Sequence, residues 1–392
     1  MRYINFLLFL FITSLLTLCT PRDIRVGSFI YVVERENSTL AVIDIENYQV
    51  VKRIPLEANL RHATIVFEPS LKYGYIATRN GKLNRINLET KEYDGYIETS
   101  KNSIGLAISQ DGQTIAVSEY EPGGITIVSV KDFKIKQVIP AKIGNNKYSK
   151  VTGLVDGPEN SFICALMDSN EIWILKRENP VDPESPYKIT HKIKTADLYP
   201  FDGLITPDGR YYVNAHFKSN ILSFIDLWNL KDRAEKIDFG KYSKKTPVKM
   251  PHMEAWANAD EKIFIAANGE PLLHVINAKT LKYSHSIPII GDGVYTVVHP
   301  FQKEIWITFS GESDGKIQII DTRTEKTIKI LDVGKKIYHL AFTPKGDRAF
   351  VSSNATNELI VIRTYDYKII KRIPLNSPSG IFGVWRAYQI GL

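Results

Sequence analysis

The sequence predicts an all-β fold, an eight-bladed β-propeller, from three observations. A five-residue strand core recurs along the chain, a second strand pair precedes most copies, and the two chain ends carry complementary parts of one blade. The copies are LAVID from Leu40, LNRIN from Leu83, ITIVS from Ile125, IWILK from Ile172, LSFID from Leu222, LHVIN from Leu273, IQIID from Ile317 and LIVIR from Leu359. Successive copies start 42 to 51 residues apart, close to the period of about 40 to 50 residues expected of a four-stranded blade.

The segments around each core predict two hairpins per blade. Each core ends in a polar residue and is followed by a second apolar segment, as in VVKRI from Val50 and IIKRI from Ile369, which predicts the two outer strands. Ahead of most copies lie two apolar segments joined by a turn signal, for example QDG after Ala107 to Ser109 and PKG after Ala341 to Thr343. These segments predict the two inner strands.

The ends of the chain predict how the ring closes. Ser28 to Val33 reads as a second strand without an inner partner, and Gly380 to Trp385 reads as an innermost strand without a blade of its own. The two termini are therefore expected to pair in one blade, so that N-terminal strands and the C-terminal strand close the ring. Closure removes the exposed sheet edges that would otherwise template aggregation.

The composition fits one large globular domain, which we expect to span residues 20–392. Apolar residues make up 44% of the 392 residues, enough for a buried core. The net charge is +7, but lysines and arginines are scattered among acids and form no stripe or tail, so nucleic-acid binding is not expected. A mildly cationic surface suits an anionic small molecule or acidic membrane headgroups.

Residues 1–19 predict export. Arg2 precedes an apolar run from Ile4 to Leu18, which is too short for a comfortable membrane span and has the size of a signal-peptide core. The run ends in LTLC, which resembles a bacterial lipobox except that Leu18 stands where a small residue is usual. We expect a periplasmic protein, possible lipidation at Cys19, and attachment to the membrane through that lipid or through an uncleaved signal.

Two histidines are the first candidates for a functional site. In a propeller the innermost strands line a central channel, and each begins at the face where ligands commonly sit. His62 opens the first inner strand after the N-terminal pair and His252 opens the fifth, so an eightfold ring places them across the channel from each other. Opposed imidazoles can hold a flat ligand, ligate an iron from both sides, or transfer protons as catalytic groups.

Further candidates lie near the same strand beginnings. His339 and His216 are secondary histidines on this face. Basic residues able to pair with ligand carboxylates are Arg61, Arg79, Lys150, Lys249 and Arg386. Asp202 and Glu254 occupy equivalent inner-strand positions in neighbouring blades, where either can act as an acid or base, with Asp202 taken as catalytic, or orient a histidine. Each of these residues can instead have no function in a site: a histidine can be a packed core residue, and a charged residue can be a solvated surface group.

Several common chemistries lack their signatures. The chain has no GxGxxG between strand and helix, no phosphate-binding loop, no HExxH and no GxSxG elbow. It also lacks CxxCH, so covalent haem attachment is not expected. The second cysteine, Cys164, lies in the apolar run Phe162 to Met167 and is expected to be a small buried core residue without a disulfide partner.

Particular segments resemble a known family over essentially the whole chain after the signal. They are RHATIVFEP from Arg61, AISQDGQTIAVSEYEPGG from Ala107, GLITPDGRYY from Gly203, KMPHMEAW from Lys249, SPSGIF from Ser377 and the terminal IGL. These segments are similar to those of the NirF family of haem d1 biosynthesis, which itself resembles the eight-bladed d1 domain of cytochrome cd1 nitrite reductase, an enzyme of denitrification. By this resemblance His62, at the family's RHA position, is the first choice for an essential residue.

The resemblance implies a ligand and partners. The ligand would be haem d1 or dihydro-haem d1, a planar iron tetrapyrrole with several carboxylates, held non-covalently. Partners would be cytochrome cd1 nitrite reductase and other haem d1 maturation proteins. The chain lacks the reductase's cytochrome c segment, which argues against nitrite reduction. We expect modification of the bound tetrapyrrole by a proton-coupled or oxidative side-chain change; a pure carrier and a protein-interaction scaffold are the alternatives.

Overall fold

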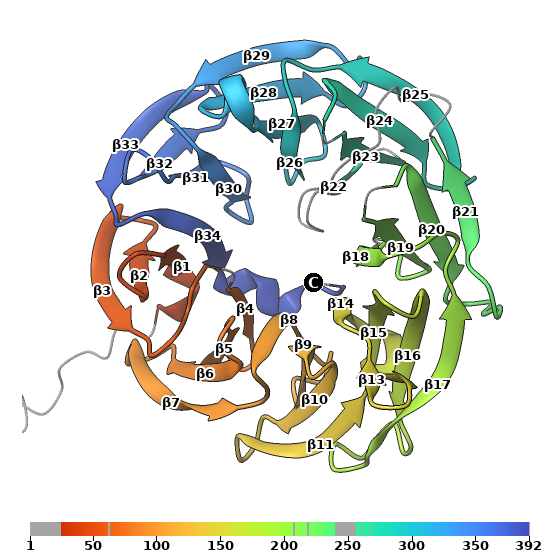
Figure 1. The fold of residues 1–392 in the computed structure, drawn as a ribbon. Helices are drawn as coiled ribbons and strands as arrows, with labels where there is room; N and C mark the ends of the chain where they lie inside the picture. The colour runs from red at the N-terminus through yellow and green to blue at the C-terminus, as the bar shows by residue number, and fades with distance from the viewer. Residues whose placement is uncertain are drawn as a thin grey trace, which may run out of the picture.

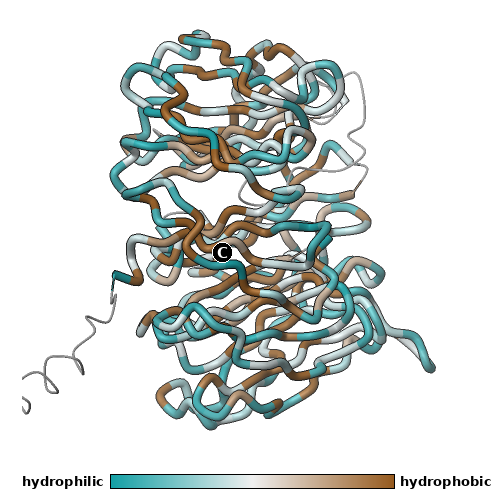
Figure 2. The backbone as a smooth tube through the Cα atoms, turned by 90° about the vertical axis from the view of Figure 1, so that its left-hand side faces the viewer, coloured by the Kyte–Doolittle hydropathy of each residue, from teal (hydrophilic) through white to brown (hydrophobic). Residues whose placement is uncertain are grey.

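The computed structural model describes residues 25–61, 63–206, 208–217, 219–239, 256–259, 261–267 and 269–391. These residues form eight four-stranded antiparallel sheets, arranged as blades around one axis (Figure 1). Seen from its edge, the molecule is a disc in which the hydrophobic segments, drawn in brown, run mainly through the interior (Figure 2). The predicted all-β, eight-bladed propeller is therefore confirmed.

The first four blades, each from its innermost strand outward, contain both chain ends and residues up to Lys194. Blade 1 comprises β34 (Pro378–Gly383), β1 (Phe29–Glu34), β2 (Thr39–Asp44) and β3 (Gln49–Pro55). Blade 2 comprises β4 (Thr64–Phe67), β5 (Tyr73–Ala77), β6 (Lys82–Asn87) and β7 (Glu92–Glu98). Blade 3 comprises β8 (Asn102–Ile108), β9 (Thr114–Glu121), β10 (Gly124–Ser129) and β11 (Lys134–Pro140). Blade 4 comprises β14 (Val151–Gly157), β15 (Ser161–Leu166), β16 (Glu171–Arg177) and β17 (Tyr187–Lys194).

The remaining blades follow in chain order, again from the innermost strand outward. Blade 5 comprises β18 (Pro200–Ile205), β19 (Tyr211–His216), β20 (Ile221–Asp226) and β21 (Glu235–Asp238). Blade 6 comprises β22 (Trp256–Ala259), β23 (Lys262–Ala266), β24 (Leu272–Asn277) and β25 (Lys282–Pro288). Blade 7 comprises β26 (Gly293–Val298), β27 (Glu304–Phe309), β28 (Lys316–Asp321) and β29 (Thr327–Asp332). Blade 8 comprises β30 (Ile337–Phe342), β31 (Arg348–Ser353), β32 (Glu358–Arg363) and β33 (Lys368–Pro374).

Short elements connect or follow the blades. A small hairpin of β12 (Lys142–Gly144) and β13 (Lys147–Tyr148) joins blade 3 to blade 4. The 3-10 segments of the described residues are η1 (Val26–Ser28), η2 (Pro158–Asn160), η4 (Gly311–Ser313) and η5 (Val384–Tyr388). Within the described ranges, no helix is long and apolar enough to cross a membrane.

The ring closes as the termini predict. β1 pairs antiparallel with β34, with Tyr31 opposite Phe382, and all eight predicted strand cores are the third strands of their blades. One detail differs, because β34 ends at Gly383 and the last two residues of the predicted strand, Val384 and Trp385, begin η5.

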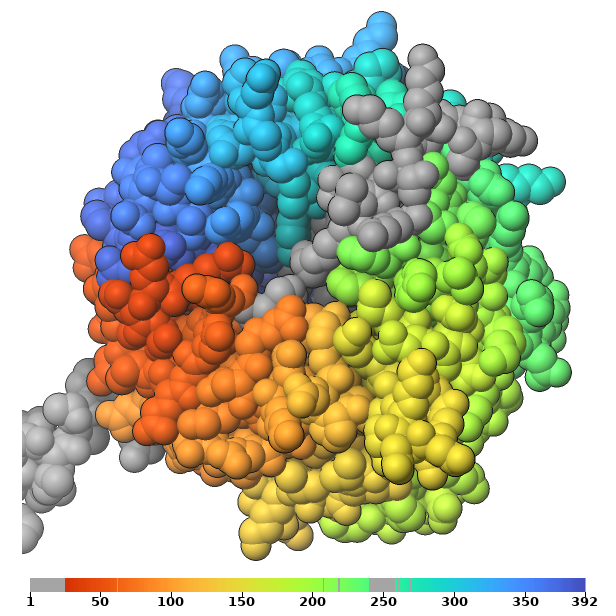
Figure 3. Space-filling view, viewed as in Figure 1, coloured from red at the N-terminus to blue at the C-terminus, as the bar shows by residue number. Residues whose placement is uncertain are grey.

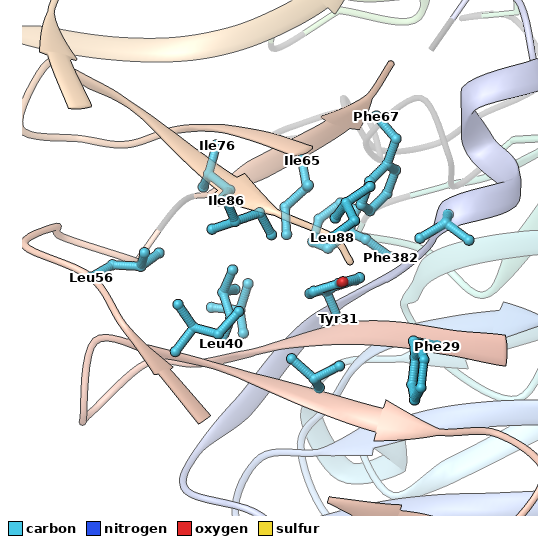
Figure 4. Packing of buried hydrophobic residues seen from close by; sticks show 14 of the residues in the cluster. Phe29, Tyr31, Leu40, Leu56, Ile65, Phe67, Ile76, Ile86, Leu88 and Phe382 are labelled. Carbon is cyan, nitrogen blue, oxygen red and sulfur yellow. The ribbon is translucent and has the colours of Figure 1, made fainter. Parts of the chain in front are cut away.

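The buried side chains pack between neighbouring blades. Between blades 1 and 2, Tyr31, Leu40, Ile65, Phe67 and Phe382 belong to one cluster of fully or almost fully buried residues (Figure 4). The strands that supply them alternate their side chains between the two faces of each sheet, so every blade fills the gap to both neighbours. This packing holds the inner strands in place around the channel.

A buried carboxylate stabilises the closure of the ring. Glu34, at the end of β1, is fully buried and accepts hydrogen bonds from Arg53 Nε at 3.0 Å, Thr39 Oγ1 at 2.7 Å and the backbone N–H of Asn376 at 2.8 Å. Because Asn376 precedes the C-terminal strand, the carboxylate links both ends of the chain. Cys164 is buried, as predicted, and burial raises the pKa of its thiol.

Candidate functional site

The two faces of the disc differ in which strand ends they carry. All inner strands run in the same sense, and the face where they begin, at Thr64 of β4 for example, also holds the ends of the second strands. We call this the entrance face, and we call the side where the inner strands end the far face. In Figure 3 the blades surround the centre of the molecule in chain order, from red at the N-terminus to blue at the C-terminus.

Arginines gather on the entrance face over blades 1 and 2. Arg35 follows β1, and its guanidinium lies 4.6 Å from the ring centre of Tyr338 in blade 8. Burial lowers the pKa of Arg35, and the positive charge of Arg61, which precedes β4, lowers it further, while Tyr338 opposes both effects. Arg35 is therefore a partly desolvated cation that also experiences the charge of the exposed Arg61, and an anion bound beside Arg35 would offset both effects.

Arg79 is a third arginine on the entrance face, and it contacts residues of blade 3. It follows β5, donates to Asn102 Oδ1 at 3.3 Å, and places its guanidinium 5.3 Å from the ring centre of Tyr120. Among the described residues, Arg35, Arg61 and Arg79 form no ion pair with a carboxylate, and Arg35 Nε is buried without a hydrogen-bond partner. The entrance face thus carries three arginines whose charge the described part of the chain does not neutralise.

Asp202 lies on the opposite side of the channel, in β18 of blade 5. Its negative charge raises the pKa of Tyr120 in blade 3 and of Tyr295 in blade 7, in both cases as a smaller effect than burial, and the pKa of Tyr120 reaches about 12. Blades 3 and 7 stand two places away on either side of blade 5. The charge of Asp202 therefore acts on groups in blades on both sides of its own blade.

His339 and Tyr295 form an aromatic pair between blades 7 and 8. Their ring centres are 4.9 Å apart at 63°, and His339 Nδ1 accepts the backbone N–H of Ile381 at 3.3 Å. Asp202, Tyr295 and His339 are each the third residue of an inner strand, and each lies within or at the end of a register shift in the pairing with the second strand. Such bulges re-aim side chains next to functional sites.

Two other predicted residues have different surroundings. His216 ends β19 and is fully buried, with Nδ1 2.9 Å from the Leu198 carbonyl and Nε2 2.7 Å from Ser223 Oγ. Both ring nitrogens are thereby used inside the protein, and burial lowers its pKa, so we leave His216 out of the site. Lys150 is exposed at the entrance rim and donates its backbone N–H to Asp168 Oδ2 at 2.9 Å.

Arg386 does not lie where the sequence suggested. It belongs to η5, beyond the end of β34, so it lies at the far face, and its prediction as an entrance residue is wrong. There it lines a cavity of about 340 Å³ together with Phe67, Asp156 and Tyr388, and burial lowers its pKa to about 10. The C-terminal segment crosses the axis here, and Gly391 donates its N–H to Asp156 Oδ1 at 2.9 Å (Figure 1).

Five predicted residues lie outside the described part of the chain: Cys19, His62, Lys249, His252 and Glu254. Their roles remain predictions. The sequence did not predict Arg35, Tyr120, Tyr295 and Tyr338, because the repeats within the chain were aligned mainly at the beginnings of inner strands. Aligning the ends of second strands as well would have placed Arg35 beside Arg79.

Comparisons with known proteins agree with this architecture. A family profile described as "Cytochrome D1 heme domain" matches residues 25–387. "Protein NirF" of Stutzerimonas stutzeri is 34% identical over 97% of this chain and 97% of its own length, and that of Pseudomonas aeruginosa is 34% identical over 93% of each. "Dihydro-heme d1 dehydrogenase" of P. aeruginosa is 27% identical over 90% of this chain and 70% of its own length.

A solved structure is also similar to this chain. "Dihydro-heme d1 dehydrogenase NirN in complex with DHE" superposes with a TM-score of 0.81 at 25% sequence identity. The match covers 96% of this chain and 79% of the solved one.

Proposed function

The chain belongs to the cytochrome D1 heme domain family and, within it, to the NirF proteins, and from this premise we propose that its channel binds haem d1 or dihydro-haem d1 during haem d1 biosynthesis. The observation that carries the proposal is the group of three arginines, without carboxylate partners among the described residues, at one side of the channel mouth. A relative solved with DHE supports a ligand of this class.

The described residues fit such a ligand. Guanidinium groups match carboxylates in shape and charge, and hydrogen bonds to charged groups contribute roughly 1.5–3 kcal/mol each. Arg35 and Arg61 would receive one carboxylate group of the ligand and Arg79 another. Tyr338 and Tyr120, which stack on two of these arginines, would hold the guanidinium planes in place.

The other side of the channel offers groups for proton transfer. Asp202 is half-buried, its negative charge raises the pKa of Tyr295, and Tyr295 contacts His339. Asp202 would act as the acid or base, and the two rings would fix where its proton goes. The bound group would supply an iron centre and a conjugated ring able to give up electrons. His62 and His252, the two histidines predicted for the channel, would hold this group.

The cellular setting follows from the predicted export signal. We place the protein in the periplasm, anchored to the membrane by Cys19 or by the uncleaved apolar segment. There it would pass its product to other haem d1 maturation proteins or to cytochrome cd1 nitrite reductase. The carrier alternative uses the same channel and the same arginines, without turnover.

Absorption titration tests the binding. Ferric haem d1 or dihydro-haem d1 is added to the purified protein, and saturable band shifts at one ligand per chain are expected. Arg35→Ala and Arg79→Ala should each weaken binding by about 10- to 100-fold, the loss of a charge-assisted hydrogen bond. Arg323→Ala, which removes an exposed arginine on the far face, is the matched control and should bind normally. Normal binding by both channel variants would contradict the proposal.

A second experiment separates enzyme from carrier. The protein is incubated with dihydro-haem d1 and an artificial electron acceptor, and the tetrapyrrole is analysed by mass. Loss of two hydrogens, matched by reduction of the acceptor, supports modification. An unchanged ligand that later transfers to another protein supports carriage.

A further inference from the structure

One connection between neighbouring blades contains an additional element. Among the described residues, the other connections from one blade to the next are loops without strands, whereas residues 141–150 fold back on themselves as the hairpin of β12 and β13. We call residues 141–150 the entrance hairpin, because they join the outermost strand of blade 3 to the innermost strand of blade 4 and so lie on the entrance face (Figure 1). Blades 3 and 4 have their four strands without it, so the ring does not need this hairpin.

The base of the entrance hairpin is buried and fixed in position. Ala141 and Ser149 are fully buried, and the N–H of Ser149 donates to the Ala141 carbonyl at 2.8 Å. Ser149 Oγ accepts the N–H of Asp168 at 2.9 Å. Gly123, in the EYEPGG segment, has φ 101°, and a Cβ atom there would collide with the Ser149 carbonyl oxygen. This glycine therefore provides both the turn and the space that the hairpin requires.

The rest of the entrance hairpin is exposed and positively charged. Lys142, Lys147 and Lys150 are all exposed, as is Tyr148 beside them, at 38%. Residues 133–155 contain no acidic residue. Within the described ranges, none of the three lysines forms an ion pair. The hairpin thus presents a positive charge that its own segment of the chain does not neutralise.

Acidic residues in the neighbouring turns have other partners. Glu171 pairs with Lys194 at 2.6 Å, and Glu121 lies 3.9 Å from Lys101. Asp168 accepts the backbone N–H at the end of the hairpin. No ion pair in the described part of the chain joins any of these three carboxylates to a lysine of the hairpin. The lysines are therefore available to an acidic group from outside the protein.

The other charges of the entrance face favour a protein over a membrane as the source of that acidic group. Glu36 in the β1–β2 turn and Glu312 in the β27–β28 turn are exposed acids, and Lys335 and Lys336 are exposed in the β29–β30 connection. These two glutamates would repel a uniformly anionic lipid surface laid over this face. A protein with one acidic patch has only to match the hairpin. Charge complementarity of this kind speeds association and selects the partner.

We propose that the entrance hairpin is the docking site for an acidic surface patch of a protein that exchanges the tetrapyrrole with the channel, with Lys142 and Lys147 as its charged contacts. The inference rests on the proposed function for the identity of the cargo and adds the surface on which the donor or acceptor protein lies. The base of the hairpin contacts Gly123, three residues after Tyr120, which stacks on Arg79. A partner docked there lies beside the mouth of the channel.

Binding measured without tetrapyrrole tests the docking site. The full-length protein is immobilised in detergent, and the probes are the organism's cytochrome cd1 nitrite reductase, prepared without haem d1, and its dihydro-haem d1 dehydrogenase. At least one probe should bind, and less tightly as the salt concentration rises. Lys142→Glu combined with Lys147→Glu should weaken this binding by about 10-fold or more. Absorption titration with haem d1 should give the same affinity for this hairpin variant as for the native protein.

Lys52→Glu combined with Lys371→Glu is the matched control, because both lysines are exposed on outermost strands, β3 and β33, and the change in charge is the same. The control should bind the probes normally. The proposal is overturned if the native chain binds neither probe, if the hairpin variant loses no more affinity than the control, or if the hairpin variant loses binding only to phosphatidylglycerol liposomes. A native chain that binds a probe but no haem d1 would refute the proposed function and not the docking site.

Discussion

Glu119 should make the stability of the propeller depend on pH in an unusual direction. It lies in β9, is only 2% exposed, and accepts a hydrogen bond from Thr126 Oγ1. Burial raises the pKa of its carboxyl from 4.5 to about 7. At about 1.4 kcal/mol per pKa unit, the difference between folded and unfolded values corresponds to about 3 kcal/mol.

The sign follows from where the proton binds more tightly. The folded-state pKa lies above the unfolded value, so the folded protein holds the proton better. The contribution of Glu119 to stability is therefore fully present below about pH 4.5 and is lost as the pH rises through about 7. Glu119→Gln keeps the acceptor for Thr126 and removes the charge. It should raise the free energy of unfolding at pH 8 by about 3 kcal/mol more than at pH 4.

Urea unfolding followed by fluorescence at several pH values measures this effect. Glu121→Gln, in the same strand but with a side chain that is 64% exposed, is the control and should follow the native pH dependence. If Glu119→Gln has the same pH dependence as the native protein between pH 4 and 8, Glu119 does not carry a raised pKa and the reasoning fails.

Three further changes test the closure and the channel. Glu34→Gln leaves Arg53 without its charged partner inside blade 1 and should lower the free energy of unfolding by about 1–3 kcal/mol in a urea titration; an unchanged midpoint would contradict the role of this carboxylate. Phe382→Ala removes a buried ring between blades 1 and 2 and should cost about 3–5 kcal/mol by the same assay, whereas a loss below about 1 kcal/mol would mean that the closure does not depend on this packing. Asp202→Asn should leave tetrapyrrole affinity unchanged and slow the conversion measured by mass, whereas unchanged conversion would remove Asp202 from the mechanism.

Periodic patterns predicted the strands well. The repeated cores, the turn signals and the incomplete blades at the two ends depend on alternating burial and on the blade period, which local sequence carries directly. The innermost strand β34 ends at Gly383, two residues before the end predicted at Trp385, because the chain turns there into η5. That turn also carries Arg386 to the far face, which no repeat pattern indicates.

Side-chain placement at the strand ends was harder to predict. His216 sits at the end of β19, where a channel residue was expected, yet its nitrogens bind Leu198 and Ser223 within the protein. Arg35 was missed, although it holds a place close to that of Arg79 in the neighbouring blade. Whether such residues point to the axis depends on bulges and on contacts between blades, which are set by the whole ring.

An experimental structure of the protein with bound dihydro-haem d1 or haem d1 tests the central claim most directly. The macrocycle should lie on the axis at the entrance face. Its carboxylates should form hydrogen bonds with Arg35 and Arg79, and Asp202 should lie on the other side of the channel. A macrocycle found elsewhere, for example in the cavity beside Tyr388 on the far face, would contradict the account.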